Sequence, residues 1–304
     1  MAITASQRRS NLCVPRGKVP VVLDTDAFNE IDDQFAIAYL LRAADKLDTK
    51  AIYAAPFLNS KVSSPAEGME KSYGEIFHLL RLLGEQRPVY RGSEAFLPDE
   101  TTPVLSDAAR DLADRADAYS PQAPLYVVAI GAITNVASAI LLNPKVAENT
   151  VVIWLGGHAL HYHDTAEYNM RQDVAAARVV FSSGVPLIQL PCMGVVNLFA
   201  VSRPELEQYL VGKNPLADYL ACNTIRYMDE KKAAAMWSKP IWDVTAVAWL
   251  LNEDDRFMLQ RNIPTPIPGY DHRYAQGTYP HEMGYVYSIR RDALLEDLLG
   301  KLTK

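Results

Sequence analysis

Ten residues near the start of the chain carry most of its candidate chemistry. Residues 24–33 read Asp-Thr-Asp-Ala-Phe-Asn-Glu-Ile-Asp-Asp, so five carboxylates lie within ten residues, with no Lys or Arg among them. Carboxylates crowded in this way raise each other's pKa values unless a cation holds them ionised. Ligands that are all oxygen select a hard ion, Ca²⁺ or Mg²⁺. The segment therefore predicts a metal site or a site for a polyhydroxylated ligand.

A helix N-terminus or an EF-hand loop would account for less of this segment. Acidic residues complement the dipole at a helix N-terminus, which would explain Glu30, Asp32 and Asp33. It would not explain Asp24 and Asp26, which directly follow an apolar strand. An EF-hand loop counted from the first aspartate would need a ligand and a glycine where this chain has phenylalanine and asparagine. We therefore favour the metal or polyol site.

The elements that must position these acids alternate between strand and helix. Apolar runs predict strands covered on both faces at 19–23, 49–55, 89–92, 125–130, 151–155 and 185–190. Helical periodicity predicts helices at 34–44, 65–83, 106–118 and 173–183, and one that begins near Val136. This order predicts an α/β fold, an open, mostly parallel twisted sheet flanked by helices with a Rossmann-like core. Ligands bind at the carboxyl ends of the strands in such sheets.

The rest of the chain is expected to be mostly helical. Helices are predicted at 203–211, 214–236 and 240–251, followed by a strand at 285–289 and a last helix from Asp292. With no linker signal between residues 20 and 300, we expect a single domain at 19–304, preceded by a flexible N-terminal arm at 1–18.

Composition narrows the function classes. The formal net charge of -6 and the lack of a dense basic run argue against nucleic acid as a partner. No stretch approaches the roughly 18 apolar residues of a membrane span, and the first residues do not resemble a secretory signal. Cys13, Cys192 and Cys222 are too few and too widely spaced for a disulfide framework or a zinc site. A cytoplasmic protein with no membrane partner is expected.

Polar side chains gather where several predicted strands end. They are rich in carboxylates and amides and poor in cations, so they suit a ligand with several hydroxyl groups and suit phosphate badly. The set comprises Asp24, Asp26, Asp32, Asp33, Asn59, Thr134, Asn135, Glu167, Asn169 and Asp243.

Four motifs in order resemble the nucleoside hydrolase family of the inosine-uridine-preferring type. That family opens with Asp-x-Asp-Pro-Gly-x-Asp-Asp, similar to the acidic segment here. Its central Gly-Pro-Leu-Thr-Asn-x-Ala resembles residues 131–137, and its Ala-Glu-Phe-Asn resembles residues 166–169, followed by Asp-Val-Ala-Ala at 173–176. A late His-Asp pair resembles Trp242-Asp243. The resemblance runs from about Val19 to the C-terminus.

The resemblance implies Ca²⁺-dependent hydrolysis of the N-glycosidic bond of a ribonucleoside or related riboside, in a homo-oligomer, a dimer or a tetramer. Asp26 would bind the ion and activate the attacking water. The other implied metal ligands are Asp33, the backbone carbonyl of Thr134 and Asp243. The implied ribose ligands are Asp32, Asn59, Glu167 and Asn169, with Asp24 behind the ligands.

Departures from the family pattern indicate a divergent branch. Five residues, 27–31, separate the first acids from the paired aspartates where the family has three, which adds Asn29 and Glu30. His161 stands where the family has a sugar-binding asparagine, and Trp242 stands where some members have a histidine acid. His281 or His161 could donate the missing proton, or stacking could raise the basicity of the base. His161, Trp242 and His281 are therefore expected to contact the substrate.

Several alternatives stay open at this point. A non-catalytic sugar or nucleoside binder would keep the Ca²⁺ site, and a haloacid-dehalogenase-like phosphatase also begins with strand-Asp-x-Asp. His158, His161 and His163 are close enough in sequence for a transition-metal site, although the surrounding acids favour Ca²⁺. Tyr227 could line a base pocket or belong to the core, and Lys231-Lys232 is interpreted as a solvated face.

Overall fold

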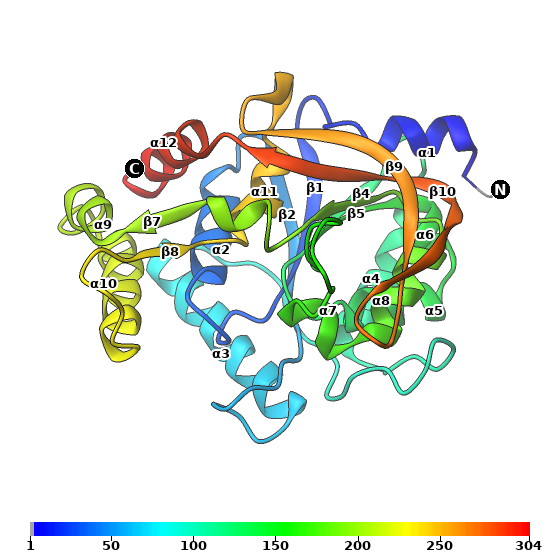
Figure 1. The fold of residues 1–304 in the computed structure, drawn as a ribbon, viewed down its shortest axis with the longest axis horizontal. Helices are drawn as coiled ribbons and strands as arrows, with labels where there is room; N and C mark the ends of the chain where they lie inside the picture. The colour runs from blue at the N-terminus through cyan, green and yellow to red at the C-terminus, as the bar shows by residue number, and fades with distance from the viewer. Residues whose placement is uncertain (1–2) are drawn as a thin grey trace.

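The structure, a computed structural model, describes residues 3–304. An eight-stranded sheet crosses its centre in the order β3-β2-β1-β4-β5-β6-β10-β9 (Figure 1). All neighbouring strands are parallel except β9 and β10. The strands are β1 (Val19–Thr25), β2 (Leu47–Ala54), β3 (Val89–Arg91), β4 (Leu125–Ala129), β5 (Thr150–Leu155), β6 (Leu187–Leu190), β9 (Met258–Pro268) and β10 (Tyr274–Ile289). The predicted open, mostly parallel α/β fold is confirmed.

Helices cover both faces of this sheet, and each face has its own apolar core. One core contains residues of α2 (Asp33–Arg42), α3 (Pro65–Leu83), α9 (Arg203–Tyr209), α10 (Pro215–Glu230), α11 (Val244–Trp249) and α12 (Arg291–Leu302). The other contains residues of α4 (Asp107–Arg115), α5 (Thr134–Leu142), α6 (Lys145–Asn149) and α8 (Val174–Ser182). Every residue of β4 and β5 is buried, as their continuous apolar sequences require. The sheet is therefore a rigid support for the loops at its edge.

The stretch before α11 differs from the sequence prediction. Residues 238–240 form a short strand, β8 (Ser238–Pro240), which pairs antiparallel with β7 (Ala200–Ser202). The helix predicted at 240–251 therefore begins only at Val244, and the helix predicted to reach residue 236 ends at Glu230. This arrangement brings β8 beside α10 at one end of the molecule (Figure 1).

A long hairpin of β9 and β10 is the largest element that the sequence does not predict. It arches over the sheet and down past α8 (Figure 1). Pro264, Pro266 and Pro268 alternate along β9, the edge strand of the sheet. Because proline removes backbone donors, this sequence resembles a loop more than a strand, and the prediction includes only the strand at 285–289.

The segment predicted as a flexible arm contains a helix in the structure, α1 (Ala5–Asn11). Thr4 caps it, and the Arg8 Nε donates a hydrogen bond to the Gly184 carbonyl at 2.7 Å. Leu12 is buried in the core. These contacts attach residues 4–12 to the body of the protein.

Candidate active site

The acidic segment lies at the point where the strand order reverses. From β1 the chain proceeds to β2 and β3 on one side, and β4 to β6 lie on the other, so the carboxyl ends of β1 and β4 border a crevice. A cavity of about 220 Å³ opens there. Its lining includes Asp26, Asn29, Glu30, Asp32 and Asp33 from the acidic segment.

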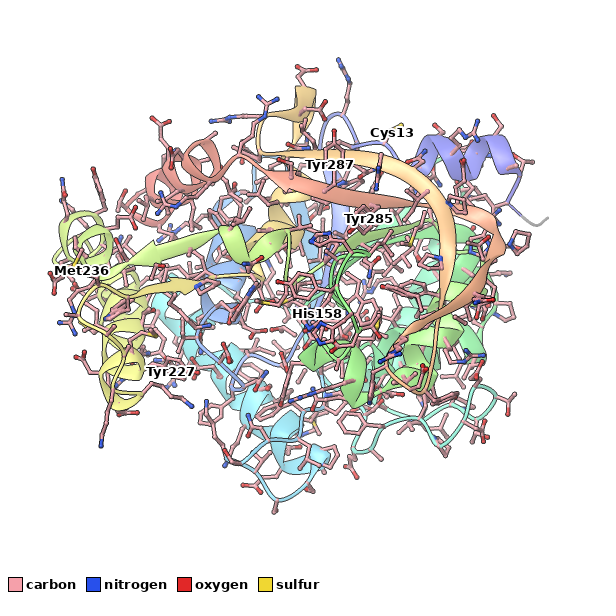
Figure 2. The ribbon with its side chains drawn as sticks, in the orientation of Figure 1. Cys13, His158, Tyr227, Met236, Tyr285 and Tyr287 are labelled. Atoms are coloured by element: carbon pink, nitrogen blue, oxygen red, sulfur yellow. The ribbon has the colours of Figure 1, made fainter. Side chains whose placement is uncertain are left out.

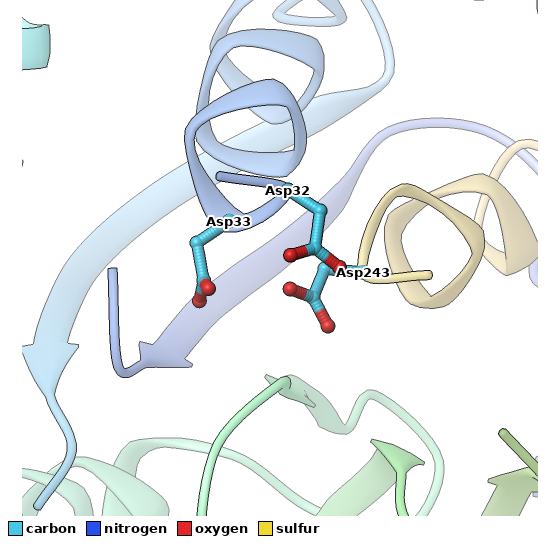
Figure 3. Close-up of side chains that lie close together, drawn as sticks. All are labelled: Asp32, Asp33 and Asp243. Atoms are coloured by element: carbon cyan, nitrogen blue, oxygen red, sulfur yellow. The ribbon is translucent and has the colours of Figure 1, made fainter. Parts of the chain in front are cut away.

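Three carboxylates converge in this cavity from two helix starts. Asp32 and Asp33 stand at the beginning of α2, and Asp243 directly precedes α11 (Figure 3). One oxygen of each lies within 4.8 Å of the others, and all three side chains are buried. Residues more than 200 positions apart thus form one oxygen-rich cluster.

Asp26 joins this cluster from the end of β1. Its side chain is 1% exposed, and its Oδ2 accepts a hydrogen bond from the Asn29 Nδ2 at 3.1 Å. Gly131, just past β4, allows the close approach, because a Cβ at that position would lie 3.3 Å from the Asp26 Cβ and 3.0 Å from Ala55. We call the four carboxylates Asp26, Asp32, Asp33 and Asp243 the acidic floor.

Burial and mutual repulsion disfavour the ionised form of the four carboxylates of the acidic floor when no cation is bound. Burial, with the Asp32 charge, raises the pKa of Asp33 to about 8. Burial and neighbouring carboxylates also raise the pKa values of Asp26 and Asp243 well above their usual range. The pKa of Asp32 is raised by burial and partly lowered by the Lys239 ammonium. A hard divalent cation would supply the missing positive charge, so the residues present fit a metal ion.

Asp24 lies behind the acidic floor and does not line the cavity. It is fully buried, and its Oδ1 accepts a hydrogen bond from the Asn135 Nδ2 at 2.7 Å. The Asn135 Oδ1 in turn accepts from the backbone and hydroxyl of Ser93. Burial raises the pKa of Asp24 to about 7, against the lowering effect of the Asn135 bond. This network joins the end of β1 to the start of α5 and to the loop after β3.

Glu167 and Asn169 form another wall of the cavity. Glu167 caps the short helix α7 (Tyr168–Gln172) and also accepts from the Gly157 N–H at 3.0 Å. Gly157 has φ +74°, a conformation that glycine adopts without strain. The Asn169 Nδ2 donates to the Leu155 carbonyl at 3.0 Å. Both side chains are therefore held rigidly, and burial raises the pKa of Glu167 to about 6.

The structure does not bring Thr134 to the cavity. Thr134 is the first residue of α5, where a carbonyl accepts a hydrogen bond within the helix. Its hydroxyl donates to Asp173 Oδ2 at 2.7 Å. Ile130, at the end of β4, lines the cavity instead, and its carbonyl accepts a long 3.3 Å bond from Asn169. Ile130, and not Thr134, is therefore the residue after β4 that lines the cavity.

The loop at 27–31, which is longer than in the family pattern, places the side-chain amide of Asn29 next to the acidic floor in place of that of Asn59. Asn59 does not line the cavity, and its Nδ2 donates to the Asn29 Oδ1 at 2.8 Å. Asn29, one of the residues that the longer loop adds, lies between Asn59 and Asp26. Glu30 also lines the cavity. The insertion thus adds two polar side chains to the site.

Trp242 lines the cavity, and its indole N–H is buried without a hydrogen-bond partner among residues 3–304. This N–H can donate a hydrogen bond to a ligand. The Lys239 ammonium lies 3.8 Å from the centre of its ring. The side chain at this position is therefore a neutral donor next to a buried cation.

The three candidate histidines lie in different places. His161 is exposed outside the cavity lining, and the His281 Nε2 lies 3.0 Å from the Phe181 carbonyl, beside α1 and far from the acidic floor. His158, named in the sequence only as part of a histidine cluster, does line the cavity (Figure 2). Its Nδ1 accepts from the Met193 N–H at 3.3 Å, which leaves the proton on Nε2. Nothing in the sequence distinguishes His158 from the neighbouring histidines.

Comparisons with known proteins agree with this geometry. The family model described as inosine-uridine preferring nucleoside hydrolase matches residues 21–277. A pyrimidine-specific ribonucleoside hydrolase, RihA, of Salmonella arizonae is 25% identical over 287 residues, which cover 85% of this chain and 87% of the relative. The structure is similar to that of a plant nucleoside hydrolase, PpNRh1, with a TM-score of 0.74 at 20% identity; the match covers 94% of this chain and 99% of the plant chain. It is also similar to the structure of a purine-preferring ribonucleoside hydrolase from Gardnerella vaginalis, with a TM-score of 0.73 at 19% identity; the match covers 93% of this chain and 98% of that chain.

Proposed function

Because the chain belongs to the inosine-uridine-preferring nucleoside hydrolase family and hydrolyses the N-glycosidic bond of ribonucleosides, we propose that it does so with Ca²⁺ bound at the acidic floor. The observation that carries this proposal is the convergence of Asp32, Asp33 and Asp243 within 4.8 Å, all buried, with Asp26 beside them. The family uses a metal ion, and carboxylate ligands in this number suit calcium.

The proposed metal ligands are Asp26, Asp33, Asp243 and the Ile130 carbonyl. The last replaces the carbonyl of Thr134 that the family resemblance implied, since Thr134 is engaged with Asp173. Ca²⁺ held by these oxygens would lower the pKa of the attacking water and offset the charge of the carboxylates. Asp32 lies in the same cluster and would accept hydrogen bonds from the ribose.

The protein's own groups then supply the rest of the reaction. Asp26 takes a proton from the water that attacks C1′ of the ribose. Positive charge develops on the sugar as the bond to the base breaks, and the carboxylates of Asp32 and Glu167 stabilise it. Asn169 and Asn29 orient the hydroxyls, Asn29 in place of the more distant Asn59. The Trp242 N–H donates a hydrogen bond to the leaving group but no proton. The base therefore departs with the electron pair of the broken C1′–N bond and takes a proton from solvent.

The sequence also left open a relative that binds a riboside without cleaving it, but membership of the hydrolase family speaks against that alternative. One experiment tests the proposed dependence of cleavage on calcium. A panel of purine, pyrimidine and nicotinamide ribosides is incubated with calcium and then with a chelator, and free ribose is measured. Release of ribose that stops on chelation supports the proposal. Release of ribose that continues unchanged in the chelator would overturn the assignment of calcium. The phosphatase alternative is wrong, because the chain belongs to a different family.

The cytoplasmic location, the homo-oligomer and the single domain at 19–304 that the sequence indicates remain predictions. Within residues 3–304, no helix has both the length and the apolar character that crossing a membrane requires.

A further inference from the structure

Three lysines from separate elements converge around one aromatic ring. Lys61 follows β2, Lys231 ends α10, and Lys239 belongs to β8. Their ammonium nitrogens lie 5.7, 5.5 and 5.9 Å from the centre of the Tyr227 ring. Tyr227 lies on the α10 side of the molecule (Figure 2). We call Lys61, Lys231 and Lys239 the basic rim.

The positive charge of the basic rim is only partly neutralised. Lys239 forms an ion pair with Glu30 at 2.6 Å. Lys61 donates to the neutral backbone carbonyl of Asn29 at 2.6 Å. Within residues 3–304, neither Lys61 nor Lys231 has a carboxylate within 4.0 Å. Burial lowers the pKa of Lys61, the Glu30 charge opposes this, and the charges of Lys231 and Lys239 add to it. Of these three ammonium groups, only that of Lys239 therefore forms an ion pair with a carboxylate among residues 3–304.

A purely structural role would explain Lys239 but not the other two lysines. Lys239 is 5% exposed, and a buried ammonium beside Glu30 and Asp32 offsets their charge. Lys61 and Lys231 are exposed and have no such partner among residues 3–304. Burial, together with the charges of Lys231 and Lys239, lowers the pKa of Lys61. An arrangement that gathers cations without pairing them is suited to an anion from outside the chain.

The lysines of the basic rim do not line the cavity themselves, but two of them contact residues that do. Lys61 contacts Asn29, and Lys239 contacts Glu30 and lies on the Trp242 ring. Arg171 places a cation in the lining itself, and its guanidinium lies 5.3 Å from the Tyr168 ring centre. The hydroxyl groups of a ribose would be bound by the acidic floor and would not require the lysines of the basic rim. A ligand that also used the basic rim would carry negative charge, and lysine is a common phosphate ligand.

We propose that the basic rim binds a phosphate group of the substrate, so that phosphorylated ribosides are preferred over neutral ribonucleosides. This substrate class rests on the proposed function, because the ribose is taken to bind the acidic floor. The phosphate could stand on the 5′ oxygen of the ribose or on the leaving group. Both offer the same dianionic oxygens to the lysines, and substrates of the two kinds distinguish them.

The test compares kcat/KM for inosine with that for inosine 5′-monophosphate, and kcat/KM for a phenyl riboside without and with a phosphate on its ring, each with calcium. The variant is Lys61→Gln/Lys231→Gln, which keeps the buried Lys239–Glu30 pair. The matched control is Lys232→Gln, an exposed lysine next to Lys231 that is not one of the three cations of the basic rim. Thermal unfolding checks that all variants are folded.

The wild type should prefer one phosphorylated substrate over its neutral counterpart by about tenfold or more, since charged hydrogen bonds are the stronger ones. The double variant should lose about tenfold or more on that substrate and less than about twofold on inosine. Lys232→Gln should behave as the wild type. Raising the salt concentration should weaken only the phosphorylated substrate.

Equal kcat/KM for phosphorylated and neutral substrates, or an equal loss on both in the double variant, would overturn the inference and leave the proposed function standing. If no riboside is cleaved, the proposed function fails. Calorimetry with ribose 5-phosphate, ribose, and the phenyl riboside with and without its phosphate then tests the basic rim alone. Tighter binding of the phosphate, lost in the double variant, would support the basic rim. Equal binding, or none, would overturn it.

Discussion

The acidic floor and the basic rim are both clusters of like charge, but they are built in opposite ways. The acidic floor consists of short side chains fixed at the ends of core elements, and all four are buried. The basic rim consists of long side chains from a loop, a helix end and a two-stranded sheet, and two of its three members are exposed. Solvent and salt can screen the basic rim, whereas the buried acidic floor needs an ion or bound protons. The first arrangement suits chemistry and the second suits selection of a ligand.

The largest expected effect lies in the acidic floor. Asp26→Asn should lower kcat by about 10³-fold, because an amide cannot accept the proton of the attacking water. The measurement is ribose release at saturating riboside, with calcium present. The exposed Asp45→Asn serves as a matched control and should be unaffected. Activity within tenfold of the wild type would place the base elsewhere.

The next effect concerns the wall between the two clusters, where Trp242 stands. Because no acid occupies this position, p-nitrophenyl riboside should be cleaved about 10²-fold faster than inosine or uridine. The ratio of kcat for p-nitrophenyl riboside to kcat for inosine or uridine measures how strongly the protein assists departure of the natural base. Similar rates on the activated and natural substrates would reveal a general acid, and His158 would then be the first residue to test, since it lines the cavity.

Calcium should stabilise the acidic floor directly. At a calcium concentration about 100 times its Kd, binding contributes about 2.7 kcal/mol, so the melting temperature should rise by about 5 °C. Asp243→Asn should abolish this rise, while Lys232→Gln should keep it. The measurement is thermal unfolding with calcium and with a chelator. An unchanged melting temperature in the wild type would contradict the metal assignment.

The pH dependence should differ with and without the metal. In the folded, metal-free protein, burial raises the pKa of Asp24 to about 7, and burial together with the Asp32 charge raises that of Asp33 to about 8. Folding therefore favours their protonated forms. This contribution to stability is present below the unfolded pKa of about 4 and is lost as pH rises through about 7 to 8.

Denaturant unfolding in a chelator should accordingly give a lower free energy of unfolding at about pH 8.5 than at about pH 5.5. Calcium, which binds the ionised form, should reduce or reverse the difference. A metal-free protein that gains stability over this range would show that the acidic floor is not protonated in the folded state.

The smallest expected effect checks that the chemistry is confined to the acidic floor and its surroundings. His281→Ala should change kcat/KM by less than about twofold on every riboside, because the His281 ring lies beside Phe181 and α1. A loss restricted to natural nucleosides would restore His281 as a leaving-group acid. Equal losses on natural and activated ribosides would indicate a structural role instead.

The sequence predicted the acidic floor better than the basic rim for a physical reason. Aspartates at the ends of apolar strands have little freedom, so the strand order alone brings Asp26 and Asp33 to one crevice. Lysine side chains are long, and those at 61, 231 and 239 meet only because β8 pairs with β7 beside α10. Nothing in the sequence around Lys231 distinguishes it from a solvated surface lysine.

Other differences have equally local causes. Any residue type can offer a backbone carbonyl, so no sequence signal separated Ile130 from Thr134. The displacement of Asn59 by Asn29 depends on the path of a loop two residues longer than the family pattern. Helix α3, by contrast, has the predicted bounds, because Ser64 caps its start and Gly84, with φ +67°, ends it.

The prolines of β9 bear on how copies of this chain can associate. An edge strand ordinarily invites another strand to extend the sheet, which is a route to dimers and also to aggregates. Pro264, Pro266 and Pro268 supply no N–H for such an extension, and the opposite edge, β3, is only three residues long. Neither edge is suited to recruiting a further strand, so an assembly of this protein is expected to form through packed side chains on its helices and loops and not through a continuous intermolecular sheet.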